Sequence, residues 1–313
     1  MNAAATRARG EALATALVAA AALAARVSGI DTLMFPELGA LAHDVFTRPQ
    51  GAWAPAPRML VLTPALTALI GFGMARWLPF GLPAVALSLG SSLLLLGLLR
   101  SPVAPAISAG LLPVALRVHS PWYPLSILLV TAALAGAVLL RAGRRHAPRP
   151  APPAGADDQT EAAATGWRWL PGYLLFAVPA ALLAQRLHLL LVPPLFVVAY
   201  EMFAHPQVCP WRARPWALLA ACVAGALCGL ASVAWLGAGP LSAVAGLLAG
   251  VLLLRVLDLH APPALAIGLL PQILARPGPS FVAAVALLCA WLIGSFALAG
   301  VAERRLFTAR RTA

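Results

Sequence analysis

The sequence of 313 residues has few charged side chains and no hydrophilic stretch long enough to form an independent soluble domain. Charged residues make up 10% of the chain and hydrophobic residues 61%. A water-soluble globule of this length needs more polar surface than this composition supplies. The composition therefore predicts a polytopic membrane protein, an all-α helical bundle with the lipid bilayer as its surroundings, because helices satisfy their own backbone groups in lipid.

Sequence signatures of enzymes are also missing. The chain has no P-loop, no HExxH and no G-x-S-x-G motif, and its histidines and carboxylates lack the spacing of metal ligands. The few cysteines lie in or beside apolar runs without paired spacing, so we interpret them as small buried hydrophobes. They are Cys209, Cys222, Cys228 and Cys289. We therefore expect a protein that is not an enzyme, with no catalytic residue, metal or cofactor.

Positive charge is concentrated in three short segments. The net charge of +12 would suggest a nucleic-acid partner in a soluble domain, but half of the 22 lysines and arginines lie near the start, the middle and the end of the chain. Loops that stay in the cytoplasm carry such an excess. We therefore expect no nucleic-acid partner, a multi-pass protein of the cell inner membrane, and both termini in the cytoplasm. The residues are Arg7, Arg9, Arg141, Arg144, Arg145, Arg149, Arg168, Arg304, Arg305, Arg310 and Arg311.

A tandem repeat organises the chain. The segment Arg100 to Pro113 (RSPVAPAISAGLLP) returns as Asp258 to Pro271 (DLHAPPALAIGLLP), an offset of 158 residues. The same offset aligns Gly71 with Gly229. Further upstream the offset is 157, which places Asp44 opposite Glu201. The two halves are therefore predicted to be two copies of one structural unit.

Each half contains four apolar runs close to the length of about 20 residues that a spanning helix needs, and two shorter runs that contain proline or glycine. Short runs of this kind are typical of re-entrant or broken helices. The long runs are Leu13 to Ile30, Arg58 to Trp77, Phe80 to Leu99, Pro121 to Leu140, Pro171 to Leu191, Pro215 to Trp235, Leu241 to Leu257 and Ser280 to Val301. The short runs are Phe35 to Phe46, Pro102 to Val118, Val192 to Phe203 and Ala261 to Ala275.

The predicted organisation has four parts. Residues 1–140 form the first transmembrane repeat and residues 169–302 the second, separated by a Pro/Ala/Arg-rich cytoplasmic linker at 141–168 and followed by a basic cytoplasmic tail at 303–313. If the two short runs of a half behave alike, each half crosses the membrane four or six times. The repeats then share one orientation. Eight and twelve crossings both fit the sequence.

Charged residues beside the short runs are the candidate functional residues, because an unpaired charge in hydrocarbon costs several kcal/mol. Asp44 and Glu201 are candidates for proton coupling. Arg100 in the first half, and Arg255, Asp258 and His260 in the second, flank the later short run and form a candidate substrate site. Arg255 and Asp258 are three residues apart and are expected to pair on one helix face.

The start of each later short run offers a second kind of site. Half-helices beginning near Pro105 and Pro263 are expected to direct unsatisfied backbone N–H groups toward the interior, where they favour a small anion. Gly110 and Gly268 would let another helix approach closely. The alternative interpretation is that this pattern serves packing alone and that the arginines extend to the lipid headgroups.

These segments resemble one known family. The run from Pro36 through ELGALAHDVFTRPQGAWAPAPR to Arg58, two following helices and the Pro-rich RSPVAPAISAG before a last helix are similar to the HPP family of integral membrane proteins. That family is named for a His-Pro-Pro motif, and its typical member has one unit of about four helices. Here His260-Ala261-Pro262-Pro263 is a loosened form of the motif, and the first copy lacks the histidine. Some members are linked to nitrite movement, so the resemblance implies a small-anion transporter or channel.

We therefore predict a transporter or channel-like protein for a small solute, in particular a small inorganic anion such as nitrite. One alternative is a membrane scaffold or assembly factor that acts through its basic linker and tail. Another is an intramembrane enzyme acting on lipid, which would require Asp44, Glu201 and His260 to converge. The sequence leaves open whether the protein forms a homo-oligomer.

Overall fold

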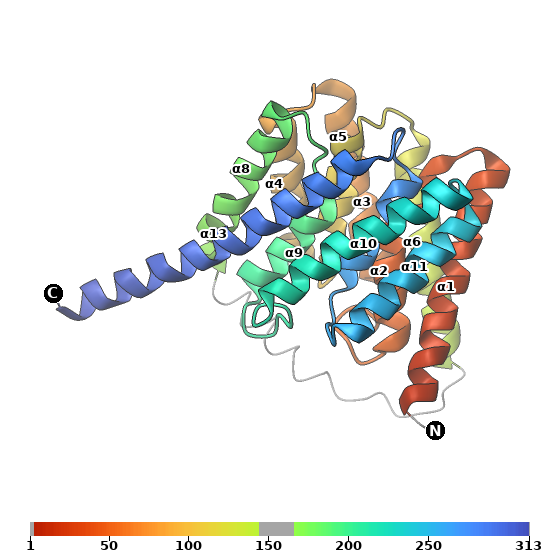
Figure 1. The fold of residues 1–313 in the computed structure, drawn as a ribbon, viewed down its shortest axis with the longest axis horizontal. Coiled ribbons are helices and arrows are strands. Elements are labelled where there is room, and N and C mark those ends of the chain that lie inside the picture. The colour runs from red at the N-terminus through yellow and green to blue at the C-terminus, as the bar shows by residue number, and fades with distance from the viewer. Residues whose placement is uncertain (1–2, 144–165, 313) are drawn as a thin grey trace.

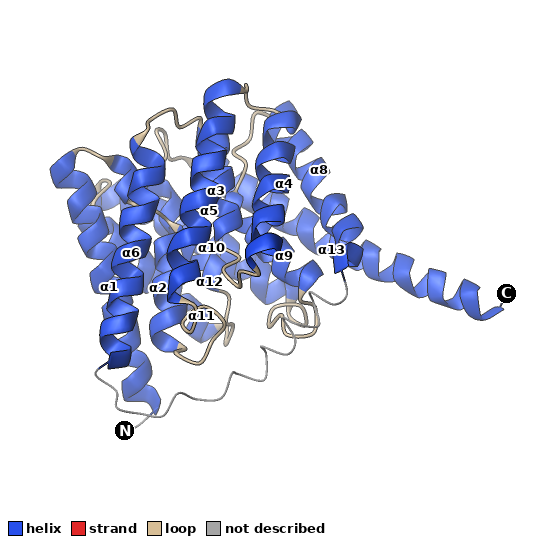
Figure 2. Ribbon diagram, turned by 180° about the vertical axis from the view of Figure 1, so that it is seen from behind, coloured by secondary structure: helices blue, strands red, loops and turns tan. Residues whose placement is uncertain are grey.

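The chain folds into a bundle of α-helices, as seen in a computed structural model that describes residues 3–143 and 166–312. Over these residues the chain forms twelve α-helices, short 3-10 turns and no strand (Figure 2). The predicted all-α fold is therefore confirmed.

The two halves contain the same sequence of elements. The first half has α1 (Ala3–Ser28), η1 (Asp31–Leu33), α2 (Glu37–Thr47), α3 (Pro57–Trp77), α4 (Leu82–Leu99), α5 (Ala106–Leu116) and α6 (Trp122–Gly143). The second has η2 (Gly166–Trp169), α8 (Leu170–Arg186), α9 (Pro193–Ala204), α10 (Pro215–Leu236), α11 (Pro240–Val256), α12 (Pro262–Leu269), η3 (Leu270–Gln272) and α13 (Pro279–Thr312). In each half the second and fifth helices are short.

Helix starts follow the repeat in the sequence. Helices α3 and α10 begin at Pro57 and Pro215, which the offset of 158 aligns. Proline in the first turn of a helix loses no hydrogen bond, because the N–H that it lacks has no partner there. The glycines before α4 and α11, Gly81 and Gly239, are also aligned. The local signals that begin each helix are thus duplicated with the rest of the unit.

The four short helices form the centre of the bundle. Every residue of α12 is buried, and nearly every residue of α2, α5 and α9 is. The eight longer helices surround them and carry exposed leucines such as Leu98 and Leu139. Because protein covers the short helices on all sides, they can end inside the bundle without exposing backbone to lipid.

Most of the surrounding helices are long enough to cross a bilayer. Seven of the described helices combine sufficient length with sufficient apolar composition, and the eighth, α11, has 17 residues. About 17 residues is the lower limit for a spanning helix. The protein is therefore a multi-pass membrane protein, as its composition predicts.

Successive helices run in alternating directions, and the short helices take part in this alternation. The last turn of α2 lies beside the start of α1, where Gly10 packs against the Phe46 carbonyl, and beside the end of α6, where Arg141 donates to that carbonyl at 3.1 Å. We call this the terminal end of the bundle, and the other the opposite end (Figure 1). Each half contains six such segments, so both repeats start and finish at the terminal end and share one orientation.

The repeats are interlocked through their first two helices. Helix α1 packs on α11 and α2 packs on α12, and in the same way α8 packs on α4 and α9 on α5. Each repeat thus completes the surface of the other. The contacts between the two halves are thus reciprocal, as expected of two units related by an approximate twofold axis.

The ends of the predicted domains differ from those in the structure. Helix α13 continues without interruption to Thr312, so the basic tail expected at 303–313 is a helical extension that projects from the bundle (Figure 1). The first repeat extends to Gly143, the end of α6. Most of the predicted linker, residues 144–165, lies outside the described residues.

Candidate functional site

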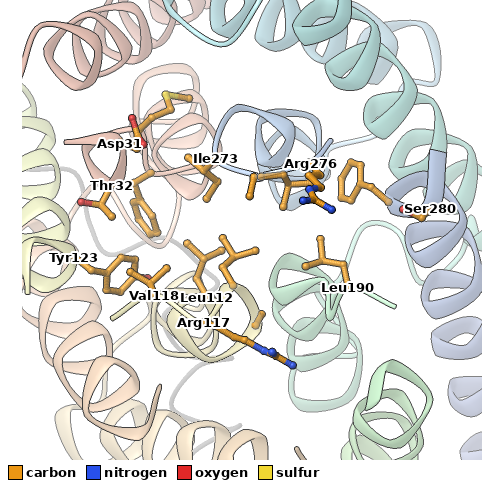
Figure 3. A pocket seen from close by; sticks show the side chains of 17 residues that line it. Asp31, Thr32, Leu112, Arg117, Val118, Tyr123, Leu190, Ile273, Arg276 and Ser280 are labelled. Carbon is orange, nitrogen blue, oxygen red and sulfur yellow. The ribbon is translucent and has the colours of Figure 1, made fainter. Parts of the chain in front are cut away.

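A cavity of about 450 Å³ lies between the two repeats at the opposite end of the bundle. Its walls come from the turns before α2 and after α5, and from residues near the matching turns of the second repeat. Figure 3 shows Asp31, Thr32 and Ile273 on one side of the space and Tyr123 and Leu112 on the other. A mostly apolar cavity of this size with a few polar groups is the usual form of a small-molecule site.

The two arginines at the cavity point in different directions. Arg276, in the turn after η3, extends toward the space in Figure 3, whereas Arg117 points away from it. The Arg117 guanidinium lies over the ring of Phe80, with 5.9 Å between its carbon and the ring centroid. Asp31 is exposed on the same rim, and Thr32 shares a hydrogen bond of 2.8 Å with the Ser126 hydroxyl. The cavity therefore presents one inward-directed guanidinium at its mouth.

A buried acid lies next to the cavity. Glu37 begins α2, two residues after the cavity-lining Phe35, and its side chain is almost completely buried. The Ser108 hydroxyl of α5 donates to Oε1 of Glu37, and Oε2 has no hydrogen-bond partner among the described residues. The cavity-lining Tyr123 donates to the neighbouring Ala109 carbonyl at 2.6 Å. Polar groups from three elements thus meet directly beside the cavity wall.

The terminal end is closed by contacts between the repeats. Nε2 of His260, before α12, lies 2.8 Å from Oδ1 of Asp44 on α2, and Arg48 lies 3.6 Å from the same oxygen. The ring of His43 stacks on that of His260 at 6.5 Å between centroids. The side chains of His43 and Asp44 are buried, so this cluster fills the junction between α2 and α12.

A second contact joins the repeats at this end. Nε of Arg255, in the last turn of α11, donates to Oε1 of Glu11 at 3.2 Å, and a further hydrogen bond joins the same two side chains. Arg7 also pairs with this carboxylate, at 3.2 Å. Glu11 is buried between the two arginines, so the pair fixes α1 against α11.

The equivalent position in the other repeat makes only a local contact. Glu201 of α9, the counterpart of Asp44, accepts from Nδ1 of His205 at 3.0 Å. Burial lowers the pKa of His205, but the hydrogen bond and negative charge of Glu201 outweigh this effect, so the pKa is raised above 6.5. The structure therefore brings Asp44 and His260 together and gives Glu201 a different partner.

One contact expected from the sequence is wrong. Arg255 does not pair with Asp258, because α11 ends at Val256 and Asp258 adopts a left-handed conformation with φ of 45° that turns it off the helix face. The Asp258 carbonyl instead accepts from Arg214 at 2.9 Å.

The expectation of free N–H groups at the half-helix starts is also wrong. The N–H groups of Ala106 and Ile107, after Pro105, donate to the carbonyls of Val103 and Ala104 at 3.1 and 3.0 Å. After Pro263, the N–H of Ala264 donates to Ala261 at 3.0 Å. Carbonyl groups of the unwound segments before α5 and α12 accept these hydrogen bonds, so the N–H groups are not available to an anion.

The role expected of the glycines in packing is confirmed. A Cβ atom added to Gly71 of α3 would overlap the carbonyl of Gly110 on α5, and the pair Gly229 and Gly268 repeats this contact between α10 and α12. Each pair lets a long helix touch the backbone of a central one. Among the described glycines, Gly71 and Gly229 make the closest approaches to another helix, and the two positions are aligned in the repeats.

None of the substrate or proton-coupling residues predicted from the sequence lines the cavity. Arg100 and Arg255 are exposed at the terminal end, away from it. The residues that sequence reasoning missed are Arg276, Tyr123 and Ser108. The first two lie in turns or first helical turns without a distinctive motif, and Ser108 gains its meaning only from its contact with Glu37.

Comparison of the chain with protein-family models, with curated proteins and with solved structures finds no match in any of the three.

Proposed function

We propose that this protein is a membrane transporter for a small solute, with a path along the approximate twofold axis between its two repeats. The observation that carries this proposal is the cavity of about 450 Å³, which both repeats line and which lies over the central short helices. Many transporters bind solute at the interface between structural repeats, close to broken or short helices.

A closed terminal end supports alternating access. The contacts of Asp44 with His260 and of Glu11 with Arg255 join elements of different repeats, so a rocking of one repeat against the other would break them. The cavity would then close at the opposite end as the terminal end opens. The structure corresponds in this scheme to the state that is open at the opposite end.

The solute is a small anion, for which nitrite is the first probe. Arg276 lines the mouth of the cavity, where it is exposed, and a guanidinium binds carboxylate-like or oxyanion groups through paired hydrogen bonds. The sequence resemblance to the HPP family agrees with this class of solute. The anion is attracted by Arg276 in this scheme, and Arg255 serves the closed end.

In this proposal the protein lies in the cell inner membrane, and its terminal end faces the cytoplasm. The positive-inside rule places the end that is richer in arginine there. Among the described residues, five arginines belong to the opposite end, and the other described arginines belong to the terminal end or the C-terminal tail. The five are Arg26, Arg76, Arg117, Arg186 and Arg276.

Flux measurements in liposomes test the proposal. Purified full-length protein is expected to take up at least one of nitrite, nitrate, formate and chloride faster than protein-free liposomes do. Arg276→Ala should reduce that uptake about tenfold, the worth of one charge-assisted hydrogen bond. Arg100→Ala, an exposed arginine away from the cavity, is the matched control and should transport normally.

Two results would contradict the proposal. Folded, inserted protein that transports none of the four anions would favour a scaffold acting through the basic linker and tail. Equal flux in Arg276→Ala and the native chain would exclude the cavity mouth as part of the path.

A further inference from the structure

The neighbours of Glu37 do not explain why the fold contains a buried carboxyl group at this position. It is 1% exposed, it accepts one hydrogen bond from Ser108, and Oε2 has no partner among the described residues. Burying a carboxylate without a cation costs several kcal/mol even after relaxation of the protein. The buried acid at this position therefore lowers the stability of the folded protein.

The second repeat shows that the fold does not need this acid. The repeat offsets place Pro194 opposite Glu37, Ala266 opposite Ser108 and Phe281 opposite Tyr123. All three polar groups are thus replaced by apolar residues in a unit with the same order of helices. Their presence in only one repeat indicates that they serve something other than helix packing.

The described residues around Glu37 supply polar groups but no ion-pair partner. Helix α5 contributes the Ser108 hydroxyl, and α6 contributes the Tyr123 phenol, which donates to the carbonyl of Ala109, the residue after Ser108. The charged groups that face α2 from α1 and from the turn before α12 are Arg7, Glu11 and His260, and they lie at its other end, beside His43 and Asp44. Among the described residues, no arginine or histidine forms an ion pair with Glu37. A proton is the cation that this site can hold without further ligands.

The cavity wall lies next to this site. Phe35 and Tyr123 belong to the cavity wall. Phe35 is two residues from Glu37 in the sequence, and Tyr123 donates to the carbonyl of Ala109, next to the Ser108 hydroxyl that donates to Glu37. On the other side, α2 leads directly to the cluster that closes the terminal end.

We propose that Glu37 is the proton-binding site of the transport cycle, taking up a proton from the cavity and releasing it when the terminal end opens. The carboxylate gains the proton from water in the cavity and becomes neutral, and it returns the proton to water on the other side. Anion and proton then cross together. This inference rests on the proposed transport function and specifies its coupling ion.

Infrared spectroscopy tests the proton site without relying on transport. Spectra of the full-length protein in liposomes, recorded as pH is raised from acid to alkaline, should show the C=O band of a buried carboxylic acid that disappears as the acid ionises. Glu37→Gln should lose this band. Asp44→Asn, which removes another buried carboxyl group of α2, should keep it. Ser108→Ala introduces the residue found at the aligned position of the second repeat. It should shift the band, because the hydrogen bond to Glu37 is lost.

Proton-driven uptake tests the coupling. Nitrate is the probe, because its conjugate acid is too strong to cross the bilayer as a neutral molecule. In the native protein the accumulation of nitrate should rise about tenfold for each unit of imposed pH gradient, as one proton per anion requires. Glu37→Gln should lose this dependence and keep exchange of labelled for unlabelled nitrate.

The outcomes separate the two proposals. Spectra of Glu37→Gln that match those of the native protein would overturn the proton site, whatever the flux. Loss of the band without transport of any anion by the native protein would support the proton site and refute the transport function. Transport with equal gradient dependence in the native protein and Glu37→Gln would refute the coupling and leave the transport function standing. If Glu37→Gln does not fold, the band shift in Ser108→Ala decides whether the site exists.

Discussion

The two repeats share their helices but differ in the polar groups at the centre. Both contain a glycine contact between a long helix and a central one, at Gly71 with Gly110 and at Gly229 with Gly268. Only the first repeat carries an acid at the start of its second helix. Features present twice are those that the bundle requires, and features present once are candidates for function. Comparison of the two repeats therefore distinguishes residues that maintain the fold from residues that are candidates for function.

The largest expected effect is on a shared feature. Gly71→Ala and Gly229→Ala should each lower the free energy of unfolding by about 3 kcal/mol, because the added Cβ overlaps a backbone carbonyl that cannot rotate away. Gly73→Ala, in the same helix as Gly71 but with open space beside it, is the control and should be neutral or stabilising. Thermal unfolding in detergent measures all three. A tolerated alanine in either repeat would show that the helices can separate at little cost.

The next effect concerns a contact that only one repeat forms. Arg255 is opposite Gly97 in the first repeat, so its pairing with Glu11 has no counterpart there. Arg255→Ala should leave Glu11 partly unpaired and weaken the closed terminal end by about 2 kcal/mol. A cysteine introduced at Ala14, buried beside this contact on α1, should then react faster with a water-soluble thiol reagent.

The same cysteine in the Arg100→Ala protein provides the control. Arg100 is exposed at the terminal end, so its removal should not change the labelling rate. Equal acceleration in both variants would show that general destabilisation, and not opening of the contact with Glu11, exposes α1.

A smaller effect is expected when the first repeat is given a residue of the second. Tyr123→Phe reproduces Phe281 and removes the hydrogen bond to the Ala109 carbonyl. The free energy of unfolding should fall by about 1 kcal/mol, the net worth of one hydrogen bond. Phe281→Tyr, the reverse exchange, tests whether the second repeat has room for a hydroxyl. If Tyr123→Phe is as stable as the native protein, the phenol is retained for its place beside the cavity and Glu37.

Much of the fold follows from the sequence because the repeat makes each signal appear twice. The predicted run Pro215 to Trp235 corresponds to α10 at Pro215–Leu236, and the short run Val192 to Phe203 to α9 at Pro193–Ala204. Apolar length and proline positions are local properties, so they can be read without knowing the tertiary structure. The number of segments could not be settled this way, because a short run crosses or re-enters according to what covers it.

The site was less predictable, because its contacts join residues that are far apart in sequence. The pairing of Arg255 with Asp258 was inferred from a spacing of three residues, which holds only if the helix continues. The actual partner, Glu11, lies in the other repeat. His260 with Asp44 is a contact of the same kind. Spacing predicts partners within one helix, whereas the interlocking of the two repeats decides partners between helices.

The smallest expected effect distinguishes two equivalent ion pairs by their dependence on pH. Asp44 with Arg48 in the first repeat corresponds to Glu201 with His205 in the second, both four residues apart. The raised pKa of His205 means that its charged form is favoured by folding. This contribution is complete below pH 6.5, the ordinary value, and is lost as pH rises through the raised pKa.

Arginine at position 205 removes this dependence, since its charge does not titrate in this range. His205→Arg should therefore gain about 0.5 kcal/mol over the native protein at mildly alkaline pH, the worth of an ion pair four residues apart on a helix, and nothing at acid pH. Melting temperatures of the native protein, His205→Arg and Glu201→Gln across this range measure the difference. A native protein whose curve runs parallel to that of His205→Arg would show that the second pair contributes no titrating charge, and the two repeats would then be equivalent at this position.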